Sequence, residues 1–110
     1  MNTLQVNNIA SKLLGSKFIG VYPLNKLPNL LTNGGYIVNT QSSELPGEHW
    51  LAFTVDNNQI NVFDPYGYYY PSILVNKLHA TRKSIIYNRR QYDEINCGQL
   101  CISWLYKQLM

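Results

Sequence analysis

The sequence contains few of the residues that metal sites and disulfide-stabilised folds require. Its 110 residues include two cysteines, Cys97 and Cys101, and two histidines, His49 and His79. Small secreted domains held by disulfides usually carry more cysteines, and a cysteine pair spaced i, i+4 on one helix is poorly placed to form a disulfide. A zinc site built from these four residues is conceivable, but their spacing matches no common structural zinc site. We therefore expect a reducing, intracellular compartment and no bound metal.

Long apolar runs and strong charge are also missing. No apolar run approaches the length of a membrane span, and the N-terminal segment lacks the basic start and apolar stretch of a secretory signal. The formal net charge is +3, with charged residues at 14% of the chain, which is ordinary for a mildly basic surface. Four basic residues do gather in the last third and form a candidate nucleic-acid-binding group: Arg82, Lys83, Arg89 and Arg90. We expect no membrane contact.

Hydrophobic and aromatic residues are plentiful. Hydrophobic residues make up 45% of the chain, and nine of the aromatic residues are tyrosines. The length fits a single compact domain over residues 1–110, and the hydrophobic content is too high for a disordered tail. Aromatic side chains bury a large area each, so this composition suits a dense core or a groove for extended peptides.

The order of apolar, polar and turn residues predicts a mixture of helices and strands. A helical apolar stripe over 3–14 comprises Leu4, Val6, Ile9, Ala10, Leu13 and Leu14, with Gly15 as a stop signal. Residues 18–30 contain two prolines and predict an irregular crossing. The remaining segments predict strands over 36–38, 50–55, 60–63 and 84–87, and helices over 71–80 and 97–109.

The strands over 49–64 predict a hairpin that brings a histidine and a carboxylate together. If the turn centres on Asn57 and Asn58, the residue paired with Leu51 is Asp64. His49 and Leu51 point to the same side of the sheet because strand side chains alternate. Asp64 then lies diagonal to His49 on one face, within reach of its imidazole.

The last predicted helix starts with a cysteine that could act as a nucleophile. Asn96 can cap this helix, and the unpaired N–H groups and dipole at its start favour a thiolate at Cys97. The same N–H groups could stabilise an oxyanion, and the amide of Gln91 could supply a second donor. Taken singly, each of these residues is more often structural; Cys101 is predicted to pack in the core and His79 to lie on the surface. The joint pattern of His49, Asp64, Gln91 and Cys97 favours nucleophilic catalysis.

Several segments, in order along residues 9–105, resemble the adenovirus-type maturation proteases, which are distantly related to the SUMO-deconjugating proteases. The strongest block is Gly47-Glu48-His49-Trp50-Leu51-Ala52-Phe53, which is similar to the His-Trp-Leu-Ala-Phe strand of that family. Phe63-Asp64-Pro65-Tyr66-Gly67 resembles the segment with the acidic triad member, and Gln91 with Asn96-Cys97-Gly98 resembles the segment with the nucleophile. Phe18-Ile19-Gly20-Val21 and Ile37-Val38-Asn39-Thr40 also match in order.

The resemblance implies an α+β, adenain-like cysteine protease fold: a central mixed or antiparallel sheet packed against helices, with the nucleophile at a helix start. It implies a triad of Cys97, His49 and Asp64, with Gln91 in the oxyanion hole. Substrate-binding residues would be Trp50, Gly47 and Glu48. No cofactor is required, although DNA or a viral peptide could act as an activator.

In biological terms, the resemblance implies a cysteine endopeptidase that cleaves viral capsid precursor proteins during virion maturation. Such an enzyme of a virophage or similar small DNA virus would be found in the host cell, in the virus factory, and packaged in the virion. The chain is about half as long as the adenovirus enzymes and has no cysteine before Cys97, so activation by a disulfide-bonded peptide is not expected.

Three other functions are compatible with the same residues. A deconjugating isopeptidase acting on a ubiquitin-like protein would use the same triad, as would an acyltransferase. A non-enzymatic peptide- or nucleic-acid-binding domain would need none of the triad residues, all of which are present.

Overall fold

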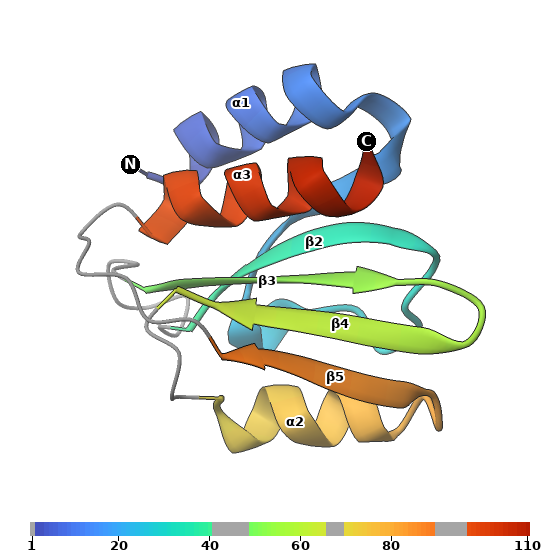
Figure 1. Ribbon diagram of the computed structural model, residues 1–110. Helices are drawn as coiled ribbons and strands as arrows, with labels where there is room; N and C mark the ends of the chain where they lie inside the picture. Colours follow the sequence, from blue (N-terminus) through green and yellow to red (C-terminus); the bar gives the residue numbers. More distant parts are fainter. Residues whose placement is uncertain (1, 41–48, 66–69, 90–96) are drawn as a thin grey trace.

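A computed structural model describes residues 2–40, 49–65, 70–89 and 97–110. These residues form three α-helices, two short 3₁₀ helices and five strands (Figure 1). In chain order the elements are α1 (Thr3–Leu14), η1 (Gly15–Lys17), β1 (Phe18–Pro23), η2 (Leu24–Lys26), β2 (Gly34–Asn39), β3 (Trp50–Val55), β4 (Gln59–Asp64), α2 (Ser72–His79), β5 (Ser84–Arg89) and α3 (Cys97–Leu109).

The five strands form one mixed sheet whose spatial order follows the chain, β1-β2-β3-β4-β5. The central pairs β2/β3 and β3/β4 are antiparallel, whereas the outer pairs β1/β2 and β4/β5 are parallel. A parallel pair needs a crossover connection. The segment containing η2 supplies it for β1/β2, and α2 supplies it for β4/β5. The predicted α+β fold with a central mixed sheet is confirmed.

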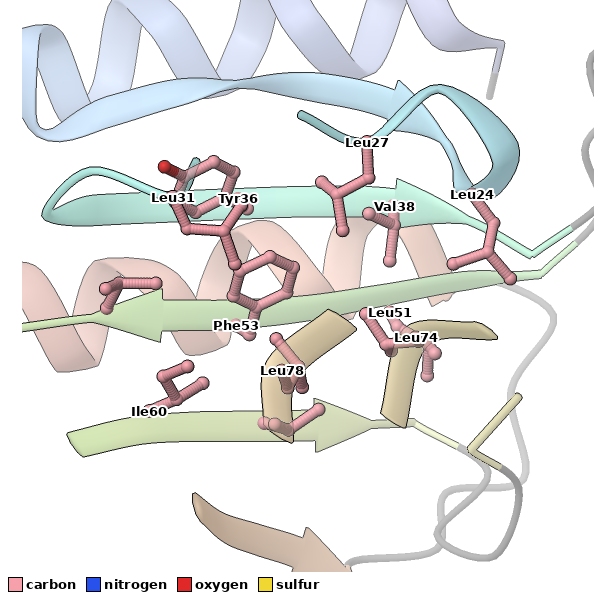
Figure 2. Close-up of a cluster of buried hydrophobic side chains, with 12 residues drawn as sticks. Leu24, Leu27, Leu31, Tyr36, Val38, Leu51, Phe53, Ile60, Leu74 and Leu78 are labelled. Carbon is pink, nitrogen blue, oxygen red and sulfur yellow. The ribbon is translucent and has the colours of Figure 1, made fainter. Parts of the chain in front are cut away.

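Helices cover both faces of the sheet, so the inner strands are buried on both sides. α1 and α3 lie together on one face and α2 on the other (Figure 1). Alternate residues of β3 divide between the two layers: Trp50 and Ala52 join the core beneath α1 and α3, whereas Leu51, Phe53 and Val55 join the opposite core. Figure 2 shows this second core, which also holds Leu74 and Leu78 of α2. The prediction that residues 50–55 are buried on both faces is confirmed.

The first helix has the predicted ends, and half of its apolar stripe is buried. Asn2 caps α1 reciprocally with Gln5, and Gly15 ends the helix with a positive φ of 61°. Val6, Ala10 and Leu14 are buried. The other three members of the predicted stripe are exposed, at 68% for Leu4, 46% for Ile9 and 44% for Leu13. The predicted helix and its stop at Gly15 are therefore present, and part of its apolar stripe is exposed because α1 lies on the outside of the molecule.

The predicted irregular crossing over residues 18–30 was partly wrong. Its first six residues are the edge strand β1, and only the remainder, including η2, is irregular. Pro23 ends this strand, a position where a sheet tolerates a residue without an N–H donor. The two prolines therefore mark the end of a strand and the crossover after it rather than excluding a strand.

The other predicted elements are present, with ends that differ by a few residues at most. Ser84–Arg89 forms the strand expected at 84–87, and α3 occupies the residues expected for the last helix. Among the described residues, no helix has the length and apolar content needed to cross a membrane.

Candidate active site

His49 lies immediately before β3 and is held through its backbone. Its carbonyl oxygen accepts a hydrogen bond of 3.0 Å from the Thr40 N–H and one of 3.4 Å from the Thr40 hydroxyl. Thr40 directly follows β2, so these bonds continue the β2/β3 pairing beyond the ends of both strands. Thr40 belongs to a segment that resembles the protease family, but no role was predicted for it. The backbone of His49 is thus fixed relative to the sheet.

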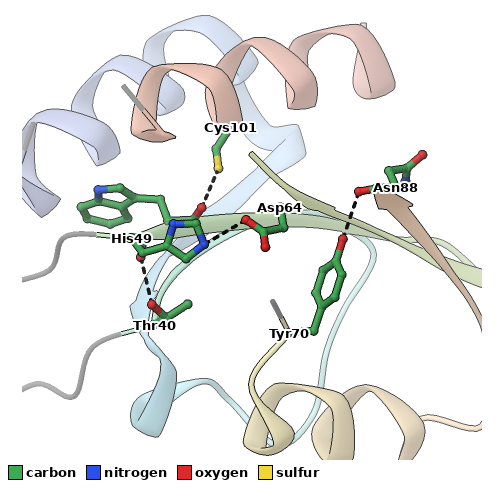
Figure 3. A network of polar contacts seen from close by, with 7 residues as sticks. Thr40, His49, Asp64, Tyr70, Asn88 and Cys101 are labelled. Carbon is green, nitrogen blue, oxygen red and sulfur yellow. Dashed lines mark hydrogen bonds and ion pairs between the residues drawn. The ribbon is translucent and has the colours of Figure 1, made fainter. Parts of the chain in front are cut away.

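Asp64, the last residue of β4, forms an ion pair with His49. Nε2 of His49 and Oδ1 of Asp64 are 2.9 Å apart (Figure 3). The ladder pairs Ala52 with Phe63 and Val55 with Ile60, which is the register predicted from a turn at Asn57 and Asn58. The predicted diagonal contact between His49 and Asp64 is therefore present.

The environment of this pair is largely closed to water. The side chain of Asp64 is fully buried and that of His49 is 12% exposed. Both ring nitrogens of His49 are shielded from solvent. A buried carboxylate is costly unless it is paired and hydrogen-bonded. Turning the His49 ring away would remove its contact with the Asp64 carboxylate, so burial favours one orientation of the imidazole.

Two contacts next to the pair attach α3 to the strands that carry it. The Cys101 thiol donates a hydrogen bond of 3.4 Å to the carbonyl oxygen of Trp50, the residue after His49 (Figure 3). The Trp104 ring stacks on Phe63, the residue before Asp64, with ring centroids 5.3 Å apart. Cys101 is fully buried, as predicted for a packing residue, but its hydrogen bond has no signature in the sequence because the acceptor is a backbone carbonyl.

Cys97 is the first residue of α3, as predicted, and its side chain lies outside the described residues. α3 starts at the end of the sheet where β3 begins and β4 ends (Figure 1). The fold therefore brings the backbone of Cys97 to the same end of the molecule as His49 and Asp64. Gln91 and the predicted helix cap Asn96 lie outside the described residues.

Of the predicted substrate-binding residues, only Trp50 is described. It is 3% exposed and belongs to the core beneath α1 and α3. Burial leaves almost none of the indole surface open to a substrate, since its ring is enclosed by the packing of α3. Gly47 and Glu48 lie outside the described residues.

The ends of β4 and β5 are fastened together near Asp64. The Asn88 side chain donates a hydrogen bond of 3.1 Å to the carbonyl of Val62, and the Tyr70 hydroxyl donates one of 3.0 Å to the carbonyl of Asn88 (Figure 3). Neither Tyr70 nor Asn88 was singled out in the sequence, because both bonds end on backbone oxygens. These contacts support the strand end that carries Asp64.

The basic candidates for nucleic-acid binding whose backbone is described lie at the two ends of β5. Arg82 and Lys83 precede β5, Arg89 ends it, and Arg90 lies outside the described residues. The Lys83 ammonium donates to the carbonyls of Asp56 and Asn57 at 2.6 and 3.0 Å. Arg82 has a positive φ of 62°. Lys83 thus supports the β3–β4 turn, whereas the Arg82 N–H bonds to the His79 carbonyl in the connection from α2 to β5.

His79 is exposed on α2, as predicted. Within the described parts of the chain, no three or more histidine, cysteine or acidic residues come together as a group that could hold a metal ion. The site itself holds a carboxylate-oriented imidazole at the end of the sheet where α3 starts.

Comparisons with known proteins add a fold-level likeness. No family model and no curated protein matches the sequence. The crystal structure of the ASFV pS273R protease matches with a TM-score of 0.59 and 17% sequence identity, over 97% of this chain and 54% of the protease chain. This chain thus spans about half the length of that protease. The likeness shows that the α+β fold of this chain is similar to that of the ASFV pS273R protease over the part that is matched.

Proposed function

We propose that this chain is a viral cysteine endopeptidase in which Cys97 is the nucleophile, His49 the general base and Asp64 the residue that orients His49. The observation that carries the proposal is the ion pair of 2.9 Å between His49 and a fully buried Asp64. It lies at the end of the sheet where a helix begins with a cysteine, within a fold shared with a protease.

The geometry of the ion pair assigns a task to each ring nitrogen. Because Nε2 faces Asp64, proton exchange with the Cys97 thiol falls to Nδ1. The Asp64 carboxylate stabilises the imidazolium that forms when the thiol gives up its proton. The start of α3 favours the resulting thiolate, since the helix dipole and the N–H groups of the first turn stabilise negative charge there.

Peptide cleavage would then proceed through a thioester. The Cys97 sulfur attacks the scissile carbonyl carbon, and the oxyanion accepts hydrogen bonds from the Cys97 N–H and the Gln91 amide. The carbon–nitrogen bond breaks as the imidazolium gives its proton to the departing amine. A water molecule, deprotonated by His49, then attacks the thioester, and the released thiol restores the starting state.

The substrates that we propose are viral capsid precursor proteins, cleaved during virion maturation in the host cell or in the packaged virion. Gly47, Glu48 and Trp50 remain the proposed substrate contacts, although Trp50 is 3% exposed. DNA or a viral peptide remains a proposed activator, and Arg82, Lys83, Arg89 and Arg90 remain the proposed DNA contacts. No cofactor is proposed.

The deconjugation of a ubiquitin-like protein is the second candidate function. It is favoured by the likeness to a protease fold, together with the resemblance of the His49 and Cys97 segments to proteases that are distantly related to the SUMO-deconjugating proteases. Maturation cleavage and deconjugation would use the same triad. They differ in the substrate: the first breaks a peptide bond within a precursor protein, and the second breaks the bond between a ubiquitin-like protein and the amine to which it is joined. An acyltransferase would likewise keep the triad and pass the acyl group to another amine or hydroxyl.

The test is mass spectrometry of capsid precursors incubated with the wild-type chain and with Cys97→Ala, each with and without DNA. Cleavage at defined sites by the wild type alone is the expected result. Equal cleavage by Cys97→Ala would contradict the nucleophile. Absence of cleavage, together with release of a conjugated ubiquitin-like protein, would replace the maturation protease with the second candidate.

A further inference from the structure

The outer surface of the α1/α3 layer holds an apolar groove that the proposed chemistry does not use. α1 and α3 run side by side over the sheet in the same direction (Figure 1). Between them lies a groove of about 370 Å³. Its lining residues are Ile9, Leu13, Gln99, Ile102, Ser103 and Tyr106.

Large apolar side chains in this groove remain open to solvent. Ile9, Leu13 and Tyr106 are 46%, 44% and 45% exposed, respectively, although they line a concave surface. Scattered exposed apolar residues are ordinary on a protein, but a contiguous set in a groove marks an interaction site. Val6, Ala10 and Cys101 already belong to the buried core beneath the groove. The exposed groove side chains are therefore not needed to complete that core.

The charged side chains of the two helices that form the groove are of one sign. Residues 3–17 and 97–110 contain three lysines, Lys12, Lys17 and Lys107, and no aspartate or glutamate. Lys12 directly precedes Leu13, and Lys107 directly follows Tyr106. A partner seated in the groove would therefore meet an apolar floor with positive charge beside it.

We propose that this groove binds an amphipathic helix of another protein, with an apolar stripe flanked by aspartate or glutamate. The groove between two neighbouring helices can receive a row of side chains from a third helix, as in helix-in-groove recognition. The lining residues of α3 extend from Gln99 to Tyr106, which at 1.5 Å per residue is about 10 Å, or two helical turns. Acidic flanks complement the lysines and steer the association.

A second copy of this chain is the less favourable occupant. Two identical α1/α3 layers facing each other would bring lysines together with no carboxylate from either layer to neutralise them. The site is also distinct from the His49–Asp64 pair, although the occupant would touch α3 from its first turn onward, since Gln99 is two residues from Cys97.

The test is a selection from a library of displayed helical peptides of about 16 residues, against the full chain carrying Cys97→Ala to prevent cleavage. The peptides share a leucine stripe, and their flanking positions vary among Glu, Lys, Gln and Ser.

Enriched peptides are synthesised, labelled with fluorescein and titrated by fluorescence anisotropy. We expect Glu to be enriched at the flanks, and we expect Ile9→Gln to weaken binding about tenfold. Lys12→Glu should weaken it too, and added salt should reduce affinity for the wild-type groove.

The matched control is Leu4→Gln, which removes an exposed apolar residue of α1 that does not line the groove and should leave binding unchanged. Failure to enrich any peptide, equal enrichment of lysine-flanked peptides, or binding that is insensitive to Ile9→Gln would overturn the proposal. So would a dimer in sedimentation that Ile9→Gln dissociates, because the occupant would then be a second copy. The readout is binding, so it stands or fails independently of peptide cleavage.

Discussion

At the scale of single residues, the carboxylate of Asp64 connects burial with chemistry. Replacing it by asparagine keeps the size and one acceptor oxygen but removes the charge that would stabilise an imidazolium. We expect Asp64→Asn to lower kcat/KM for a cleavable peptide by about 100-fold or more, within the range attributed to acid–base catalysis. Thermal unfolding of the same variant shows whether the fold is retained. Wild-type cleavage by a folded Asp64→Asn variant would contradict the assigned role.

Gly34 and Gly35 form a matched pair for testing backbone constraint at the start of β2. Gly34 has a φ of 144°, and a Cβ there would lie 2.7 Å from Ile19 and 3.0 Å from the Lys17 carbonyl oxygen. At Gly35 the close neighbours are the flexible ends of Leu105 and Leu109, which can shift. We expect Gly34→Ala to reduce the free energy of unfolding by about 1–3 kcal/mol, measured by urea denaturation. Gly35→Ala should cost less, and the reverse order would show that crowding outweighs backbone conformation.

At the scale of elements, the β3–β4 turn depends on a charged side chain. The Asp56 carboxylate accepts hydrogen bonds from the backbone N–H groups of Asn58 and Gln59 at 2.8 and 2.7 Å. These bonds, with a smaller contribution from Lys83, hold the pKa of Asp56 below its ordinary value of 3.8. The contribution of Asp56 to stability is therefore fully present above pH 4 and is lost as the pH falls through its lowered pKa in the folded state.

This sign gives a pH-dependent prediction for the turn. Between pH 5 and pH 3 the wild type should lose more free energy of unfolding than Asp56→Asn, because only the wild type has a carboxylate at this position to protonate. Urea titrations of both proteins at the two pH values measure the difference, and parallel losses would show that the turn does not depend on the charge.

The elements that could be predicted from the sequence are those with strong periodicity. The last helix and the β3–β4 hairpin show clear patterns, and the hairpin register alone was enough to predict that His49 meets Asp64. β1 was missed because Gly20 and Pro23 weaken the strand pattern of an edge strand. The sequence did not indicate that half of the α1 stripe is exposed, because periodicity marks apolar residues without showing how many of them a neighbour covers. The Cys101 and Asn88 hydrogen bonds end on backbone carbonyls, which every residue has.

At the scale of the whole molecule, two hydrophobic cores lie on opposite faces of one sheet. Leu105 of α3 belongs to one core and Leu78 of α2 to the other, and both are fully buried. Because the strands contribute to both cores, we expect the domain to unfold in a single transition. Leu105→Ala and Leu78→Ala should each cost about 2–5 kcal/mol and lower the same transition. Two separate transitions in calorimetry of either variant would show that the layers unfold independently.

The position of α3 in the chain has a consequence for biosynthesis. All five strands precede this helix, and neighbours in the sheet are neighbours in the sequence. A chain that folds from its N-terminus during translation can therefore assemble the sheet and its α2 layer while α1 alone covers the opposite face. The helix that completes this α1/α3 layer also begins with Cys97. Within the proposed function, the nascent chain would gain its nucleophile only after the strands next to His49 and Asp64 have been synthesised, so that translation order delays the onset of proteolysis.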